Sequence, residues 1–161
     1  MKKLSDRAVY MAKVRSVISV GVAVVLGVVI GGYLFAQSQP RSIISLNHCE
    51  QCLTSQELAG LLASVGIQKF PGFLPDVVME TDKTIVLKDP FGRERVHYLI
   101  IPKKDIKNIG EISEADEPYL VDAFFVARQI IEEKRLVRYQ LLTNGPGFQD
   151  VTYLHFHLIG T

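Results

Sequence analysis

The sequence predicts an α+β domain, built on an antiparallel sheet with helices and preceded by a single transmembrane helix. The first observation is that no charged side chain occurs between Arg15 and Arg41. The second is that residues 37–161 carry short β-rich runs and amphipathic helical patterns in the order helix, strands, helix, strands. That order favours an antiparallel α+β fold, because a parallel sheet would alternate strands and helices one by one.

Residues 16–36 are the predicted transmembrane helix. The apolar run from Val17 to Ala36 has about the 20 residues that an α-helix needs to cross a bilayer. A cleaved signal peptide is the alternative, but its apolar stretch is about 7 to 15 residues and ends in a small-x-small site. Here the run is longer and ends Leu34-Phe35-Ala36, so we expect an uncleaved anchor in the lipid bilayer.

Residues 1–15 form a basic tail with five Lys or Arg side chains and one acidic side chain, so its net charge is +4. Because the whole chain has a net charge of +1, the rest of the chain carries −3. By the positive-inside rule, we expect this tail to lie in the cytoplasm and the domain after the span to be exported. The protein would then be a single-pass protein of the inner or plasma membrane. In a bacterium the domain would be periplasmic. Its mild acidity predicts no nucleic-acid partner.

Three small residues, Ala23, Gly27 and Gly31, recur every four positions in the span. Such a small-xxx-small ridge lets a second helix approach closely, which predicts a homodimer or contact with the subunits of a membrane complex. The alternative is background composition, since glycine is common in membrane helices.

Residues 37–73 are predicted to form a connector with a Cys-x-x-Cys pair and a short helix. The capping-box pattern Thr54-Ser55-Gln56-Glu57 predicts where the helix begins, and Gly66 predicts where it stops. In residues 74–161, the runs Asp76–Met79 and Thr84–Lys88 predict a hairpin, and Val96–Ile101 predicts a third strand that ends at Pro102.

A second capping box, Ser113-Glu114-Ala115-Asp116, opens a predicted helix that ends near Lys134-Arg135. Two strands follow, Arg138–Leu142 and Val151–Ile159, joined by a turn at Asn144–Gly147. Side chains alternate along a strand, so Tyr153, His155 and His157 are expected to share one face. Two imidazoles are rarely needed for packing, which indicates chemistry; the alternative is two half-exposed histidines on a sheet face.

The segment 147–160 resembles the signature of the histidine triad (HIT) family, three histidines separated by single apolar residues after a Gly-x-Gln-x-Val lead. Upstream, His97 to Lys104 is similar to that family's strand ending Ile-Pro-Lys-Lys, and Leu87-Lys88-Asp89 to its nucleotide-binding strand. The resemblance covers residues 74–161. It implies a HIT-like fold, a nucleoside phosphate ligand, common homodimers and, in active branches, hydrolysis or transfer through a nucleotidyl-histidine.

The resemblance also implies roles for single residues. His155 falls on the nucleophile, His157 on the third histidine, which contacts the phosphoryl group, and His97 on a fourth histidine in the same pocket. Asp89 matches a position that binds ribose hydroxyls, although a turn-capping Asp before Pro90 is the alternative. Gln149 and Asn144 match phosphate-side contacts, with a loop that looks two residues short after Asn144.

Two departures from the family pattern bear on activity. Tyr153 occupies the first triad position, where it would line the nucleotide site as a phenol with a pKa of about 10. Asp150 stands where several members have a hydroxyl residue. We therefore expect slow turnover, partly restored by Tyr153→His. The alternative is an inactive domain that serves as an accessory subunit of a membrane complex.

The other candidate site is the pair Cys49 and Cys52, which follows His48. Three interpretations stay open: a disulfide, a zinc site that includes His48, and a redox-active pair. We favour the disulfide because the domain is expected to be exported. In some HIT proteins a zinc site uses a similar pair, but the other two ligand positions are Asp105 and Tyr153 here, so no metal or other cofactor is expected.

Overall fold

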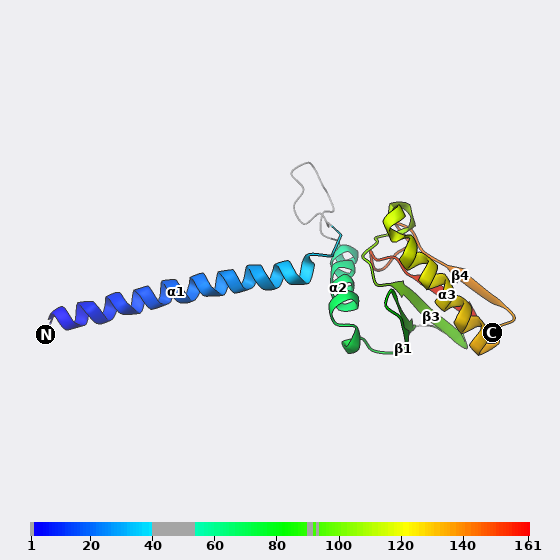
Figure 1. Cartoon of the computed structure of the whole chain (residues 1–161), viewed down its shortest axis with the longest axis horizontal. Coiled ribbons are helices and arrows are strands. Elements are labelled where there is room, and N and C mark those ends of the chain that lie inside the picture. The colour runs from blue at the N-terminus through cyan, green and yellow to red at the C-terminus, as the bar shows by residue number, and fades with distance from the viewer. Residues whose placement is uncertain (1, 40–53, 90–91, 93) are drawn as a thin grey trace. The chain divides into compact units, whose positions relative to one another are not determined.

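The computed structural model describes residues 2–39, 54–89, 92 and 94–161. These fall into two compact units, Met1–Ala36 and Gln37–Thr161 (Figure 1). The candidate pair Cys49 and Cys52 and the neighbouring His48 lie outside the described residues.

The first unit is one helix, α1, Lys2–Phe35. Its portion Lys13–Phe35, 23 residues with a mean hydropathy of 2.5, is long and apolar enough to cross a membrane by length and composition. The described part of the predicted basic tail, residues 2–15, is helical and continuous with this portion, because it holds no Pro or Gly that would interrupt the helix. Ideal Cβ atoms built on Gly27 and Gly31 would meet nothing within 4 Å, so this ridge is open.

The second unit begins with α2, Ser55–Lys69, whose first turn is capped by Thr54. The Thr54 hydroxyl accepts a hydrogen bond of 3.2 Å from the amide of Glu57, as the capping-box pattern predicts. The predicted stop at Gly66 is wrong, since the helix continues for another three residues to Lys69. Gly66 stays helical because its carbonyl accepts from the amide of Phe70.

Five strands form one antiparallel sheet in the order β1-β2-β3-β5-β4. Their bounds are β1 Val77–Glu80, β2 Thr84–Lys88, β3 Val96–Pro102, β4 Tyr139–Leu142 and β5 Phe156–Gly160. The described residues also form three short 3-10 helices: η1 Pro71–Phe73, between α2 and β1, and η2 Ile109–Glu111 and η3 Glu114–Asp116, which follow β3. The predicted hairpin and third strand are confirmed within one residue at each end.

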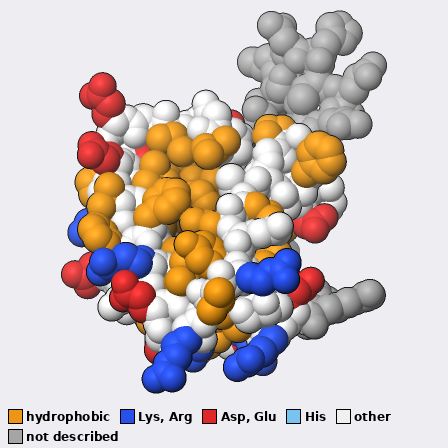
Figure 2. Space-filling model, turned by 90° about the vertical axis from the view of Figure 1, so that its right-hand side faces the viewer, with side chains coloured by type: hydrophobic (Ala, Val, Ile, Leu, Met, Phe, Trp, Pro, Cys, Tyr) orange, Lys and Arg blue, Asp and Glu red, His pale blue; other side chains and the backbone are white. Residues whose placement is uncertain are grey.

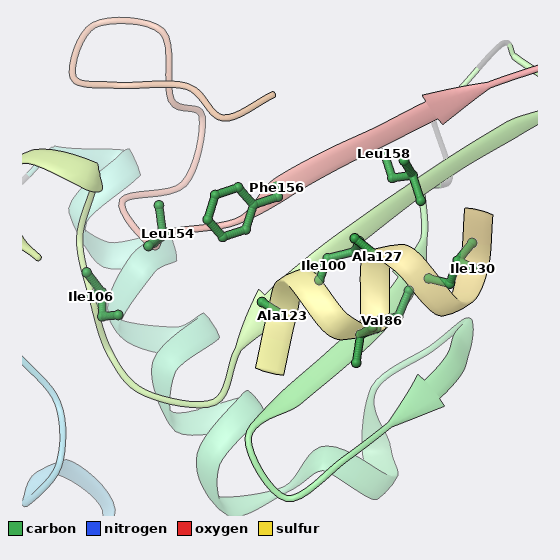
Figure 3. Packing of buried hydrophobic residues seen from close by; sticks show 10 residues of the cluster. Val86, Ile100, Ile106, Ala123, Ala127, Ile130, Leu154, Phe156 and Leu158 are labelled. Atoms are coloured by element: carbon green, nitrogen blue, oxygen red, sulfur yellow. The ribbon is translucent and has the colours of Figure 1, made fainter. Parts of the chain in front are cut away.

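The helix α3, Glu117–Lys134, covers one face of the sheet. Its buried side chains pack on apolar residues of β2, β3 and β5 (Figure 3). The second capping box is confirmed, because Asp116 accepts from the amide and hydroxyl of Ser113 at 2.7 Å each. This cluster is the larger core of the domain: Val86, Ile100, Ile106, Ala123, Val126, Ala127, Ile130, Leu154, Phe156 and Leu158.

The opposite face of the sheet carries a smaller cluster, in which Ile67 of α2 packs with Ile85, Ile101 and Tyr153. The last strand begins at Phe156 and not at Val151 as predicted. The chain before it leaves the ladder, because the amide of Leu154 donates to the carbonyl of Ile106 at 2.6 Å. The alternation of apolar residues continues through this bend, which is why the sequence pattern overestimates the strand.

Candidate functional site

Two histidines meet on the sheet face opposite α3. His97 lies in β3 and His157 in β5, in a register that pairs His97 with Ile159 and His157 with Leu99. Their sequence neighbours Tyr98, Phe156 and Leu158 point the other way, into the α3 cluster. Side-chain alternation in both strands therefore places the two imidazoles on one face, diagonally across a strand pair.

The two rings join a carboxylate. Nε2 of His97 lies 3.1 Å from Nδ1 of His157 and 3.1 Å from Oδ2 of Asp89. Nδ1 of His97 faces Oε2 of Glu94 at 3.4 Å. Asp89, His97 and His157 are all partly buried, so these contacts form in a site that is only partly open to water.

A tight turn fixes Asp89 beside His97. The amide of Asp89 donates to the carbonyl of His97 at 3.0 Å, and the amide of Gly92 donates to the carbonyl of Asp89 at 3.3 Å. An ideal Cβ on Gly92 would lie 2.7 Å from both Cβ and Nδ1 of His97. Since real Cβ atoms do not approach that closely, only glycine lets the turn press against the imidazole.

His155 immediately precedes β5 and is held by the backbone. Its Nδ1 lies 2.7 Å from the carbonyl oxygen of Tyr153. A carbonyl only accepts hydrogen bonds, so Nδ1 carries the proton and Nε2 presents a lone pair. The rings of His155 and His157 meet edge to face with centroids 4.9 Å apart. The imidazole of His155 therefore lies next to a second imidazole, with Nε2 available to a ligand.

The surroundings of His157 disfavour its protonated form. Burial lowers the pKa of His157 below the usual 6.5, and the charges that His155 and His97 gain on protonation lower it further, whereas Asp89 opposes them. Nε2 of His157 is buried and has no hydrogen-bond partner among the described residues. A ligand oxygen or proton at this nitrogen would satisfy it.

The two residues predicted on the phosphate side lie on either side of the turn after β4. Gly145, Pro146, Gly147 and Phe148 form a type II turn, with φ +87° at Gly147 and a 3.0 Å bond from the Phe148 amide to the Gly145 carbonyl. The turn thus begins one residue later than predicted, and Asn144 precedes it.

Gln149, just after this turn, is partly buried and donates a 3.1 Å hydrogen bond to the carbonyl of Lys107. It lines a cavity of about 390 Å³ between the turn and the start of α2. No described contact brings Gln149 or Asn144 onto a histidine.

Tyr153 is placed differently from our expectation. Its side chain is 1% exposed, belongs to the cluster with Ile67, and donates a 2.9 Å hydrogen bond through its hydroxyl to the carbonyl of Pro102. The prediction that Tyr153 lines the nucleotide site is therefore corrected, because a phenol in these core contacts is closed to a ligand. Its backbone carbonyl, and not its side chain, contacts a histidine of the site, His155. Asp150 is exposed.

Glu94 and Gly92 belong to the site and were missed in the sequence. Neither lies in a motif that carries chemistry by itself, and their role depends on their closeness to the ring of His97. The available signal was the turn-forming sequence Asp89-Pro90-Phe91-Gly92 directly upstream of the strand.

Comparisons with known proteins match the part of the chain that holds these histidines. Residues 74–161 match the family model described as scavenger mRNA decapping enzyme C-term binding. An uncharacterized HIT-like protein of Chlamydia trachomatis is 35% identical over 88 residues, which are 53% of this chain and 79% of that protein. A HIT-like protein of Synechococcus elongatus is 33% identical over 88 residues, 53% of this chain and 77% of that protein.

Solved structures resemble the domain as well. A HIT family hydrolase from Clostridium thermocellum superimposes with a TM-score of 0.55 at 33% identity, covering 60% of this chain and 89% of that one. A HIT family hydrolase from Legionella pneumophila gives 0.54 at 29% identity, covering 58% and 88%. A histidine triad nucleotide-binding protein from Candida albicans gives 0.50 at 26% identity, covering 58% and 71%.

Proposed function

Because the chain belongs to the histidine triad family, we infer that its domain binds nucleoside phosphates and hydrolyses or transfers a nucleotidyl group through His155. The observation that carries this inference is the 2.7 Å contact between Nδ1 of His155 and the carbonyl of Tyr153. It fixes the tautomer in which Nε2 is unprotonated, as a nucleophile requires. The hydrolase and nucleotide-binding titles of the solved relatives support the same class of reaction.

The proposed reaction has two displacement steps. Nε2 of His155 forms a bond to the α-phosphorus while the bond from phosphorus to the leaving group breaks, and that group takes up a proton from solvent as it departs. Water then attacks the nucleotidyl-histidine, releases a nucleoside monophosphate and restores His155. His157, with its buried Nε2, is the group proposed to contact the phosphoryl oxygens. Substrates of the adenosine phosphoramidate or dinucleotide type fit this scheme.

The remaining site residues have proposed supporting roles. Asp89 would accept hydrogen bonds from ribose hydroxyls, and His97 orients both Asp89 and His157 through its 3.1 Å contacts. Gln149, whose side-chain amide donates to the carbonyl of Lys107, and Asn144 would approach the phosphates from the turn after β4.

Anchoring in a membrane is also a proposal. The apolar helix Lys13–Phe35 supports it, and the basic residues before the helix support a cytoplasmic N-terminus with the HIT domain exported. Pairing of two chains through the open Ala23, Gly27 and Gly31 ridge would follow. Protease added to intact spheroplasts should degrade the domain; full protection would contradict the orientation.

An accessory subunit of a membrane complex is the second candidate function. A groove of about 490 Å³ on α3, mostly apolar, favours it. Figure 2 views the domain from the end that carries α3 and β4, and hydrophobic side chains gather there. Phe124 and Phe125 are more than half exposed at this groove, which is more apolar surface than a domain working alone needs.

Turnover measurements separate the two functions. Wild-type chain and His155→Asn should bind a nucleoside monophosphate alike, because asparagine approximates the shape of Nδ1 and its carbonyl contact. Only the wild type should release adenosine monophosphate from adenosine phosphoramidate. Equal turnover of the two proteins, with binding retained, would exclude the enzyme and leave the accessory subunit.

A further inference from the structure

The exposed face of α2 is apolar where the outer face of a surface helix is normally polar. The buried residues of this helix are Gly60, Ser64 and Ile67, whereas Leu58 and Leu62 are exposed, Leu62 by 62%. A surface helix of a soluble domain usually buries its large apolar side chains and turns polar ones to solvent. Leucines at i and i+4 are neighbours on one helix face, so the two exposed side chains form one apolar stripe.

Two exposed aromatic side chains follow directly after α2. The Phe73 ring is 89% exposed and meets the ring of Phe70 edge to face, with centroids 6.3 Å apart. Residues 58–75 contain no acidic residue and one basic residue, Lys69, although the chain after residue 15 is net negative. The exposed apolar residues of this region, named here the α2 surface, are Leu58, Leu62, Phe70 and Phe73.

The chain that follows α1 is hydrogen-bonded to the second unit. Nζ of Lys69, in the last turn of α2, donates to Oε1 of Gln37 at 3.3 Å. The hydroxyl of Ser38 lies 3.1 Å from that of the buried Ser64. The next residue donates through its amide to the buried Asp105 at 2.8 Å. Three consecutive residues are therefore held on the domain, two of them on α2.

The connection between the proposed span and α2 is therefore short. α1 ends at Phe35, two residues before Gln37, and two residues of extended chain cover about 7 Å. A chain anchored through α1 keeps the Lys69 end of α2 near the lipid headgroups. We propose that the α2 surface lies in the headgroup region of the bilayer that α1 spans. This inference rests on the proposed membrane anchor and is independent of the proposed reaction.

The chemistry of the α2 surface fits a lipid partner. Leucine and phenylalanine side chains with a basic residue beside them are typical of segments that lie in the membrane interface. Because residues 58–75 lack acidic side chains, anionic headgroups meet no repulsion there, and the charge of Lys69 suits them. Contact with lipid would remove Leu62 and Phe73 from water. The domain would then rest on the bilayer through a defined face.

Tryptophan fluorescence tests the proposal, because the chain contains no Trp. The full chain is reconstituted into vesicles of phosphatidylcholine and phosphatidylglycerol. Phe73→Trp reports on the α2 surface, and Phe125→Trp is the matched control at an exposed position of α3, which packs on the opposite face of the sheet. Lipids brominated on their acyl chains should quench Phe73→Trp at least about threefold more strongly than Phe125→Trp. Equal quenching, or none at Phe73→Trp, would overturn the proposal.

Charge substitutions in the Phe73→Trp chain locate the contact. Leu58→Glu, Leu62→Glu should reduce quenching by brominated lipid about threefold or more, because carboxylates disfavour the interface. The matched control Val121→Glu, Phe125→Glu changes two exposed apolar residues of α3 at the same spacing and should leave quenching unchanged. Equal quenching in the two folded double variants would overturn the proposal.

Two further outcomes separate the lipid contact from its alternatives. Phe73→Trp emission that shifts with protein concentration, without quenching by lipid, would indicate contact between two copies and overturn the proposal. Alkaline carbonate extraction of wild type reports on the anchor by itself. Release of the chain would contradict the anchor and this inference with it, whereas an anchored chain without quenching of Phe73→Trp would overturn the lipid contact alone.

Discussion

The hydroxyl of Tyr153 donates a 2.9 Å hydrogen bond to the backbone carbonyl of Pro102, at the far end of β3 from His97. Tyr153 stands where the family pattern has its first histidine, and this bond gives its buried hydroxyl a partner. The phenol fills the core between the sheet and α2 while its own carbonyl holds His155. Replacement of the first histidine therefore leaves the backbone contact of His155, the proposed nucleophile, intact.

Tyr153→Phe should lower stability without lowering turnover. The variant removes the hydroxyl from a buried carbonyl partner, which typically costs about 1–2 kcal/mol, but keeps the ring and the backbone carbonyl that orients His155. The thermal unfolding midpoint of the domain should fall, and nucleotide turnover at a temperature well below it should stay within about threefold of wild type.

The buried position of Tyr153 also reverses the effect on turnover that the sequence predicted for Tyr153→His. An imidazole in the core cluster would lose apolar packing and could not reach His157 from there, so turnover should not rise. A clear gain in turnover for Tyr153→His would show that this side chain does act in proton delivery.

Gly92→Ala should damage the site more than the fold. The new Cβ would lie 2.7 Å from His97, so the imidazole must move, and a misplacement of about 1 Å in a catalytic group can cost about 100-fold in rate. We expect turnover to fall about 10- to 100-fold in a folded protein. Gly72→Ala is the matched control, because its Cβ would meet nothing within 4 Å; equal losses in both variants would contradict the prediction.

Nucleoside monophosphate should bind more tightly as the pH falls. Burial holds the pKa of His157 below 6.5 in the free protein, and a bound phosphate anion favours the imidazolium, so binding takes up a proton. Affinity therefore rises as the pH falls from 7.5 toward the lowered pKa. Titrations of wild type and His157→Gln isolate this contribution, since the ligand's own ionisation is common to both; identical slopes would exclude His157 as the linked group.

Asp116 should govern acid stability. Burial alone would raise its pKa, but hydrogen bonds from Lys104 and Ser113 outweigh burial and hold the pKa below 3.8. The carboxylate thus stabilises the fold fully above the unfolded value and loses this contribution as the pH falls through the lowered one. Unfolding midpoints measured from pH 6 to pH 2 should drop on the acid side in wild type, and the drop should be smaller in Asp116→Asn.

Local patterns predicted the order and type of the elements. Capping boxes and hydrophobic periodicity act within a few residues, and both predicted caps, at Thr54 and Ser113, are present. The start of β5 was not predictable in this way, because the bond from Leu154 to Ile106 joins distant segments. His97 and His157 lie in sequence motifs and could be predicted from them. Glu94 and Gly92 lie in no such motif, and only the three-dimensional structure shows that they contact the ring of His97.

Trapping the covalent intermediate tests the central claim most directly. Wild-type chain is mixed with adenosine phosphoramidate, quenched within one turnover at alkaline pH, where phosphorus–nitrogen bonds to histidine survive, and digested for mass spectrometry. We predict an adenylyl group on His155 that is absent from His155→Asn and appears at neither His97 nor His157. Substrate consumption without an adduct on His155, or an adduct on another residue, would contradict the account.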